Sequence, residues 1–416
     1  MTIARDRFDK SYEWKAVTLL TLSFGLVGLD RWIIAPLFPS MMKDLNLNYQ
    51  DMNNIVGVLG LSWGIFAVLA GGLSDRIGRK RVLVPAIVGF SLLSGLSGFA
   101  TGLMSLIFIR ALMGITEGSF CPTSFAATND ASNPARRGFN LGLQQSTFPL
   151  FGLAFGPLIA TQLLKVMDWR WIFVIVAIPG LVLAVLLART IREPQTIGTQ
   201  AKVERAPLRE ILRHRNVPLS MFALFCAMSG IFTISANIPS YLVDYLKLSN
   251  GEMGFVTSGI GFGGFLGQLV LPGISDVIGR KKSAIVGFVI AAAFLYAFAN
   301  AGANPLVLFS LLFGSCFFCF GLLGLITGPI AAEAAPVGLV SSTAGIIIGS
   351  GEIFGGGIAP AIAGAIAQNY GIQHTLTMAL TGLCLGVVTS LFLQETAPRM
   401  ASKTAAPAAP GLDVEA

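Results

Sequence analysis

Long apolar stretches alternate with short polar ones along the whole chain. Each stretch has about 20 residues, the length that an α-helix needs to cross the ~30 Å hydrocarbon layer of a bilayer. With charged residues, Pro and Gly as breaks, the pattern predicts six membrane-spanning helices in each half of the chain. The expected spans are 15–38, 50–72, 82–101, 103–125, 141–163 and 171–190, followed by 218–241, 253–273, 284–302, 305–329, 341–367 and 373–393. The chain is therefore predicted to be an all-α membrane protein with twelve transmembrane helices.

A charged hairpin recurs at the same place in each half. The sequence GLSDRIGRKR at 72–81 returns as GISDVIGRKK at 273–282. Such a duplication predicts two related six-helix bundles, as in many secondary transporters. We expect the bundles at 1–190 and 218–393, a cytoplasmic linker at 191–217, and a disordered cytoplasmic tail rich in Ala and Pro at 394–416.

The repeated hairpins combine turn residues with charges. The glycines allow a tight turn, the aspartates are expected to cap the N-terminus of a helix, and the basic residues should lie at the membrane surface. The hairpins must also shift when the two bundles move. We therefore expect a conformational gate at Gly72, Asp75, Arg76, Gly78, Arg79, Asp276, Gly279 and Arg280.

Composition and charge agree with a membrane protein. Only 12% of residues are charged and 54% are hydrophobic, whereas a soluble domain has about 25% charged residues. The net charge of +7 does not indicate a nucleic-acid partner, because 22 of the 28 Lys and Arg residues fall on one side of the predicted spans. Four fall on the other side, and this bias predicts that both termini are cytoplasmic. Short loops and no apparent cleavable signal peptide suit the inner (cytoplasmic) membrane of a bacterium.

The sequence shows no sign of an enzyme, a cofactor or a metal site. All five cysteines lie in apolar surroundings, and Cys316 and Cys319 are interpreted as small buried side chains despite their CxxC spacing. His214 and His374, the only histidines, flank predicted spans. The P-loop and HExxH patterns are absent from the sequence.

Five charged residues lie well inside apolar spans, away from the span ends: Asp30, Arg31, Arg110, Glu117 and Glu352. A charge facing lipid costs a few kcal/mol at least, so each is expected to face a partner or a wet cavity. Arg110 and Glu117 are seven residues apart, two turns along one face of the fourth span. One interpretation is a buried salt bridge. The other is that the arginines bind an anionic substrate while the carboxylates carry protons.

Two further features concern helix shape and the lining of a cavity. Five glycines surround Glu352 and predict a bent, closely packed helix. Glu333, near a cytoplasmic helix end, is interpreted as a loop or gate residue. Candidate cavity-lining side chains are Trp63, Gln144, Gln145 and Asn237, with ordinary helix packing as the alternative for each.

Several of these motifs resemble the major facilitator superfamily. The two hairpins resemble the family's loops between spans two and three and between spans eight and nine. Arg110 with Gly114 resembles its fourth-span motif, and Arg192-Glu193-Pro194 with Glu395-Thr396-Ala397-Pro398-Arg399 resembles the ends of its two halves. The resemblance covers almost the whole chain. It implies the major facilitator fold, two six-helix bundles that work by alternating access, commonly as a monomer.

Within that superfamily, Asp30-Arg31 together with Arg110 and Glu117 resembles the anion:cation symporter group, which includes carriers of sugar acids and other carboxylates. By that resemblance Arg31 would bind the substrate carboxylate, Asp30 and Glu117 would take up protons, and Arg110 would pair with them. The group often has Asn where this chain has Glu352, and its usual Tyr before the Asp-Arg pair is replaced by Gly28 and Leu29. These departures weaken the case for a sugar acid and leave aromatic and short aliphatic acids open.

The leading hypothesis is a secondary active transporter that takes up an organic anion with protons. Trp63, Gln145, Asn237 and Arg31 are its candidate substrate-binding residues. Asp30, Arg110, Glu117 and Glu352 are its candidate proton-coupling residues. The alternative is a drug/proton antiporter, since Gly152 to Pro157 resembles a motif of exporters that importers share. A non-transporting nutrient sensor is disfavoured by the short linker and tail.

Overall fold

The computed structural model describes residues 9–133, 136–193, 208–335 and 340–397. These residues contain twelve helices that are long and apolar enough to cross a membrane, and each coincides with one predicted span. The twelve-helix prediction is confirmed. The helices extend beyond the apolar stretches at several ends, because helical hydrogen bonding continues into the polar residues next to each span. Most of the linker and the tail that the sequence analysis assigned lies outside the described residues.

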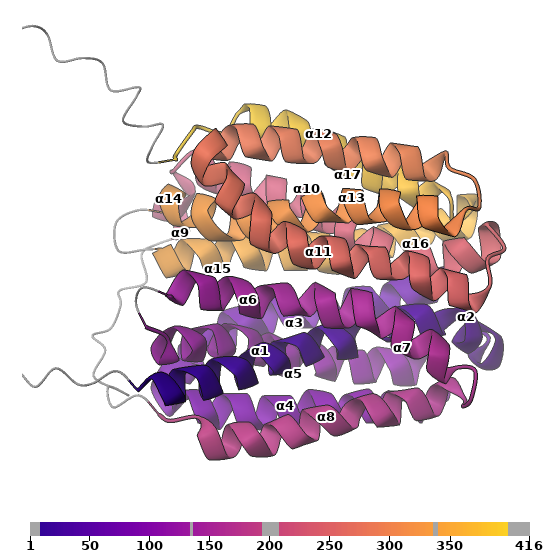
Figure 1. Cartoon of the computed structure of the whole chain (residues 1–416), viewed down its shortest axis with the longest axis horizontal. Coiled ribbons are helices and arrows are strands. Elements are labelled where there is room, and N and C mark those ends of the chain that lie inside the picture. The colour runs from indigo at the N-terminus through magenta and orange to yellow at the C-terminus, as the bar shows by residue number, and fades with distance from the viewer. Residues whose placement is uncertain (1–8, 134–135, 194–207, 336–339, 398–416) are drawn as a thin grey trace, which may run out of the picture.

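The first half contains eight α-helices and one π-helical segment (Figure 1). They are α1 (Lys10–Trp32), α2 (Ile34–Leu45), α3 (Tyr49–Ile77), α4 (Arg79–Ser97), α5 (Leu103–Ala131), α6 (Arg137–Pro149), η1 (Leu150–Phe155), α7 (Gly156–Leu163) and α8 (Trp169–Thr190). Helices α1 and α2 form the first span, and α6, η1 and α7 form the fifth.

The second half has a similar order with three π-helical segments. Its elements are α9 (Leu208–Leu212), α10 (Asn216–Ser240), η2 (Tyr241–Tyr245), α11 (Asn250–Ile278), α12 (Arg280–Ala299), α13 (Pro305–Leu325), η3 (Ile326–Ile330), α14 (Ala331–Ala334), α15 (Val340–Ser350), η4 (Gly351–Ile358), α16 (Ala359–Tyr370) and α17 (His374–Leu391).

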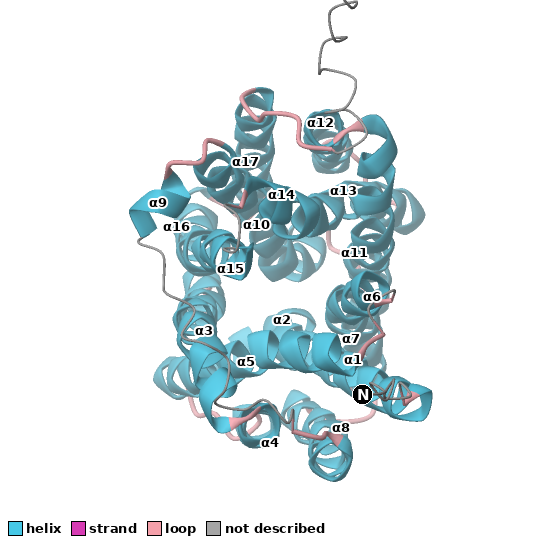
Figure 2. Ribbon diagram, turned by 90° about the vertical axis from the view of Figure 1, so that its left-hand side faces the viewer, coloured by secondary structure: helices cyan, strands magenta, loops and turns pink. Residues whose placement is uncertain are grey.

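The helices of each half gather into one bundle, as the end-on view in Figure 2 shows. The bundles meet along two seams, where α3 packs on η4 and α16, and where α11 packs on α6, η1 and α7. We call the end of the molecule where α1 begins and α17 ends the terminal face, and the opposite end the far face (Figure 1). The spans run alternately from one face to the other.

Glycines let the bundles approach closely at both seams. A Cβ added to Gly60 of α3 would overlap the backbone of Gly356 in η4. On the other seam, a Cβ on Gly261 of α11 would overlap the backbone at Leu153 and Ala154 of η1. Because side chains are missing at these points, the helices make backbone contacts of the kind that stabilises helix pairs in membranes.

Neutral side chains and one carboxylate close the far face between the bundles. The Tyr49 hydroxyl donates to Asp244 Oδ2 at 2.9 Å. Asn53 and Asn237 exchange hydrogen bonds between their side-chain amides at 2.9 and 3.0 Å. Gln50 Nε2 donates to the carbonyl of Ala361 at 3.1 Å. Since α3 begins and α10 ends at the far face, these contacts seal that side.

The repeated hairpins turn through a single glycine each. Gly78 and Gly279 have φ angles of 107° and 106°, which L-residues rarely adopt. The backbone of Gly72, Asp75 and Arg76 belongs to α3, but the surroundings of these residues lie outside what the structure describes.

Glutamates from distant segments cap the helices that follow these turns. Glu193, beyond α8, accepts hydrogen bonds from the backbone N–H of Arg79 and Lys80 at 2.8 and 3.0 Å. Glu395, beyond α17, accepts from the backbone N–H of Arg280 and Lys281 at 2.7 and 3.2 Å. The two halves therefore repeat this tertiary contact as well as the hairpin sequence.

The expectation that Asp276 caps the second of these helices was wrong. Asp276 still lies inside α11, and its carboxylate pairs at 2.6 Å with the side chain of Arg280, four residues on. Arg280 also binds Glu333 at 2.9 Å, and Arg79 binds Asp130 at 3.3 Å. These contacts tie each hairpin to its own bundle, and the gate function of the hairpins stays a prediction.

Replacing either capping glutamate should destabilise the protein. We expect Glu193→Ala and Glu395→Ala each to cost about 0.5–2 kcal/mol, because two helical N–H groups lose their acceptor. The measurement is the melting temperature of the purified protein in detergent. The control is Glu210→Ala, which removes an exposed glutamate of α9. A melting temperature equal to that of the control would contradict the capping assignment.

Candidate functional site

A cavity of about 100 Å³ lies between the two bundles near mid-membrane. Its volume is below the ~300–1,000 Å³ of pockets for drug-sized ligands. Aromatic side chains dominate its lining, namely Phe24, Trp32, Trp63, Phe125, Phe148, Phe232 and Phe320. Its charged lining residues are Arg31 from the first bundle and Glu352 from the second. The cavity is thus apolar with one oppositely charged pair.

Arg31 and Glu352 form an ion pair across the bundles. The distance between Arg31 Nη2 and Glu352 Oε2 is 3.1 Å, and the two side chains are 3% and 10% exposed. Among the described residues this is the ion pair that joins the two halves of the chain. Glu352 lies in the π-helical segment η4, a helix distortion often found at functional sites. The bent, glycine-rich helix expected there agrees with this geometry.

Aromatic rings surround the guanidinium of Arg31. Its Cζ lies 4.7 Å from the ring centroid of Phe232 and 5.9 Å from that of Trp63. Both distances permit cation–π attraction, which strengthens away from water. Arg31 Nε has no hydrogen-bond partner within the chain. The guanidinium of Arg31 therefore has a hydrogen-bond donor that Glu352 does not use.

Arg110 of α5 holds the backbone that carries Arg31. Its Nη1 donates to the carbonyl oxygens of Asp30 and Arg31 at 3.0 and 3.3 Å. Gly114, one turn further along α5, lies where a Cβ would overlap Ser62 and the Leu59 carbonyl of α3. The missing side chain of Gly114 thus allows α3 and α5 to approach each other closely.

Two further carboxylates are buried beside this arginine. Asp30 is 1% exposed and Glu117 is fully buried. Both carboxylate oxygens of Glu117 and one of Asp30 lack a hydrogen-bond partner within the chain. Glu117 interacts electrostatically with Arg31, Arg110 and Glu352. Within the described part of the chain no ion pair joins Arg110 to Glu117, and the buried ion pair of the centre is the one between Arg31 and Glu352.

The other predicted binding residues separate into two groups. Trp63 and Gln145 line the cavity. Gln144 instead donates to Ser124 inside the first bundle, and Asn237 is paired with Asn53 toward the far face. Phe232 and Gln268 also line the cavity, and neither was predicted from the sequence as a binding residue. Phe232 carries no signal in the sequence, because an apolar residue that faces a cavity resembles one that faces lipid.

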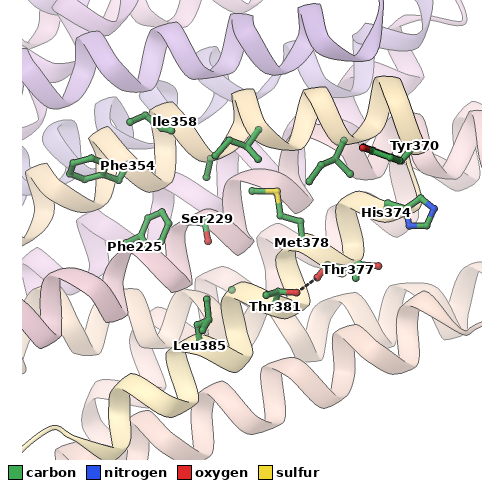
Figure 3. A pocket seen from close by; sticks show the side chains of 14 residues that line it. Phe225, Ser229, Phe354, Ile358, Tyr370, His374, Thr377, Met378, Thr381 and Leu385 are labelled. Carbon is green, nitrogen blue, oxygen red and sulfur yellow. Dashed lines mark hydrogen bonds between the residues drawn. The ribbon is translucent and has the colours of Figure 1, made fainter.

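A larger groove of about 650 Å³ lies on the outside of the second bundle (Figure 3). Phe225, Phe354, Met378 and Leu385 line it with other apolar side chains from α10, η4, α16 and α17. Its lining contains no Asp, Glu, Lys or Arg among the described residues. It has no arginine or lysine to pair with a carboxylate, so the cavity at Arg31 is the candidate site. No cluster of three or more potential metal ligands occurs in the described ranges.

Comparison with known proteins places these observations in a family. The model of the Major Facilitator Superfamily matches residues 20–347 and 220–414. The hexuronate transporter of Bacillus subtilis is 31% identical over 322 residues, covering 71% of this chain and 76% of that protein. A probable 4-methylmuconolactone transporter of Cupriavidus pinatubonensis is 28% identical, with 86% of both chains covered. The D-galactonate transporter of Escherichia coli is 23% identical, covering 91% of this chain and 94% of that one.

A solved structure supports the same fold. A bacterial homolog of the human lysosomal transporter Spinster, in an inward-facing and unoccupied conformation, superposes with a TM-score of 0.76. The superposition covers 96% of this chain and 100% of that one at 17% identity. At this identity the likeness concerns the fold alone.

A double-mutant cycle should detect the ion pair between Arg31 and Glu352. We expect Arg31→Met and Glu352→Leu each to lower stability by about 3–5 kcal/mol, because each leaves a buried charge unpaired. The double variant should lose less than the sum of the two. Melting temperatures in detergent measure this coupling. Strictly additive losses would show that the two side chains do not interact in the folded protein.

Proposed function

The chain belongs to the Major Facilitator Superfamily and is a transporter rather than an enzyme, and we propose that it imports an organic anion together with protons by alternating access. The observation that carries this proposal is the Arg31–Glu352 pair, which bridges the bundles inside the cavity. The relatives support an organic acid as substrate, since they include a hexuronate transporter and a D-galactonate transporter.

In this mechanism Glu352 occupies the position of the substrate carboxylate. Both groups present two oxygens to a guanidinium, and Arg31 can bind either one. An entering anion would displace Glu352 from Arg31. The freed carboxylate would then lie in an apolar cavity without its partner, a costly state unless it takes up a proton. Substrate binding and protonation of Glu352 are thereby linked.

The balance of central charges leads to the same conclusion. Asp30, Glu117 and Glu352 could contribute three negative charges, and Arg31 and Arg110 contribute two positive ones. With every carboxylate ionised, the centre would carry one uncompensated negative charge. Adding an anionic substrate would raise this to two. Because uncompensated charge is expensive in a membrane, we propose that at least one proton enters with each substrate molecule.

The closed far face fits one state of a transport cycle. The distribution of Lys and Arg predicts that the terminal face is cytoplasmic. In this orientation the hydrogen bonds of Tyr49 and Asn53 separate the cavity from the outside. Rocking of the bundles would break these contacts, and the repeated hairpins are proposed to gate the cytoplasmic side. The membrane is proposed to be the bacterial inner membrane.

The antiporter alternative is less well supported by the site. A pump for lipophilic cations needs a carboxylate that is available to its substrate. Glu352 is the acidic residue that lines the cavity, and Arg31 already neutralises it. An incoming cation would have to compete with that arginine, whereas an incoming anion is attracted by it.

Substitution of Arg31 should abolish uptake. We expect Arg31→Met to reduce uptake of a labelled organic acid into proteoliposomes by at least 100-fold, about 2.8 kcal/mol at 1.4 kcal/mol per factor of ten. Arg31→Lys should be less active than the parent, because an ammonium cannot bind a carboxylate bidentately. The control is Arg213→Met, which removes an exposed arginine after α9. Normal uptake by folded Arg31→Met protein would remove Arg31 from the mechanism.

Acidification of the outside should stimulate uptake, and Glu352 should be required for this response. Lower external pH supplies the proton that must enter with the anion, so the uptake rate of the parent should rise as pH falls. Glu352→Gln keeps the shape of the side chain but cannot take up a proton. We expect this variant to exchange labelled for unlabelled substrate while losing most of its acceleration by an inward proton gradient. Retention of the full acceleration would assign the coupling to Asp30 or Glu117 instead.

A further inference from the structure

The side chains that line the cavity indicate the shape and polarity of the uncharged part of the substrate as well as its charge. We propose that the transported anion is a carboxylate on a planar, largely apolar ring, of the class of aromatic monocarboxylates, and not a polyhydroxylated sugar acid. This inference rests on the proposed function, because it assumes that the cavity at Arg31 binds the substrate.

The cavity has few polar groups for the hydroxyls of a sugar acid. Besides the ion pair, the polar lining groups among the described residues are the side chains of Gln145, Gln268 and Thr327 and the unpartnered indole N–H groups of Trp32 and Trp63. The Thr327 hydroxyl already donates to the carbonyl of Leu323 at 2.8 Å. Two side-chain amides and two indole N–H donors therefore remain, and Gln268 Oε1 has no partner within the chain.

Indole N–H groups only donate, so the two amide oxygens are the main acceptors left for the several hydroxyl donors of a sugar ring. Each hydroxyl left without a partner in a water-poor site lowers affinity by about tenfold. A ring with several hydroxyls would lose most of its binding energy in this way. A ring with one or two polar substituents could be satisfied by Gln145 from α6 and Gln268 from α11, which approach from opposite bundles.

Aromatic side chains form a wall on the terminal side of Arg31. The ring centroid of Phe24 lies 5.0 Å from that of Phe125 and 5.7 Å from that of Phe148. Phe24 lies seven residues before Arg31 on α1, two helical turns or about 10 Å along the helix. A carboxylate on Arg31 would place its ring toward this wall, at the distance of one planar ring and its substituent. Rings stack there in offset or edge-to-face arrangements.

The test compares three carboxylates with six-membered rings, namely benzoate, cyclohexanecarboxylate and glucuronate. Binding to the purified full-length chain in detergent is measured by calorimetry, and uptake is measured in proteoliposomes. We expect benzoate to bind at least tenfold more tightly than glucuronate, with cyclohexanecarboxylate between them. The order separates the effect of planarity from that of apolar surface, because the ring size is the same.

Matched variants assign the preference to the residues named above. Phe125→Leu keeps an apolar side chain and should weaken benzoate binding by about three- to tenfold, while acetate, which reaches only Arg31, binds as before. Gln268→Leu should weaken glucuronate binding if the site is one for sugar acids, and the exposed control Arg213→Met should leave benzoate binding unchanged. An unchanged affinity of Phe125→Leu for benzoate would show that the aromatic wall does not bind the ring of the substrate.

Failure of this inference can be distinguished from failure of the proposed function. If glucuronate binds as tightly as benzoate and Arg31→Met abolishes its binding, the substrate class is wrong and organic-anion transport stands. If no acid binds in an Arg31-dependent way, both proposals are overturned. Arg31-dependent binding of benzoate without binding of glucuronate supports both.

Discussion

Burial of an arginine between two halves of a membrane protein is the constraint that organises the centre of this chain. A lone guanidinium at that depth would be strongly unfavourable, so Arg31 needs an opposite charge, and Glu352 of the other bundle supplies it at 3.1 Å. The remaining features support this pair. Arg110 binds the carbonyl oxygens at the end of α1, Phe232 and Trp63 contact the guanidinium, and glycines at both seams bring the bundles close enough for the contact.

The two halves share a scaffold but not a site. Each hairpin turns through a glycine, and each following helix is capped by a glutamate from the end of its own bundle. These contacts make each bundle a unit that can move as a whole. The central charges are distributed unequally, because Asp30, Arg31, Arg110 and Glu117 belong to the first bundle and Glu352 to the second. In the proposed mechanism, movement of the bundles would have to separate this one central ion pair, and a ligand that replaces one partner would remove that obstacle.

The spans could be predicted from the sequence because bilayer thickness sets the length of an apolar helix. The buried charges were also recognisable, since any Asp, Glu or Arg inside such a span is unusual. Their partners were not, because Arg31 and Glu352 are 321 positions apart and only the packing of the bundles joins them. The same reason explains the glutamate caps and the position of Asn237, which binds Asn53 near the far face. The aromatic lining could not be predicted for another reason. Side chains that face lipid and side chains that face an apolar cavity are of the same apolar types.

The hydrogen bonds that join the bundles at the far face are weak enough in total for ligand binding to break them. Three hydrogen bonds between neutral groups contribute about 1 kcal/mol each, and the bond from Tyr49 to the carboxylate of Asp244 about 1.5–3 kcal/mol. Their total of about 5 kcal/mol is close to the ~5.5 kcal/mol that moves a two-state equilibrium from 1:99 to 99:1. A buried charge pair that gains or loses a partner changes the energy by a similar amount. In the proposed mechanism, a change in what Arg31 binds would therefore be large enough in energy to decide whether the far face is open or closed, although Tyr49, Asn53 and Asn237 are not among the residues that line the cavity.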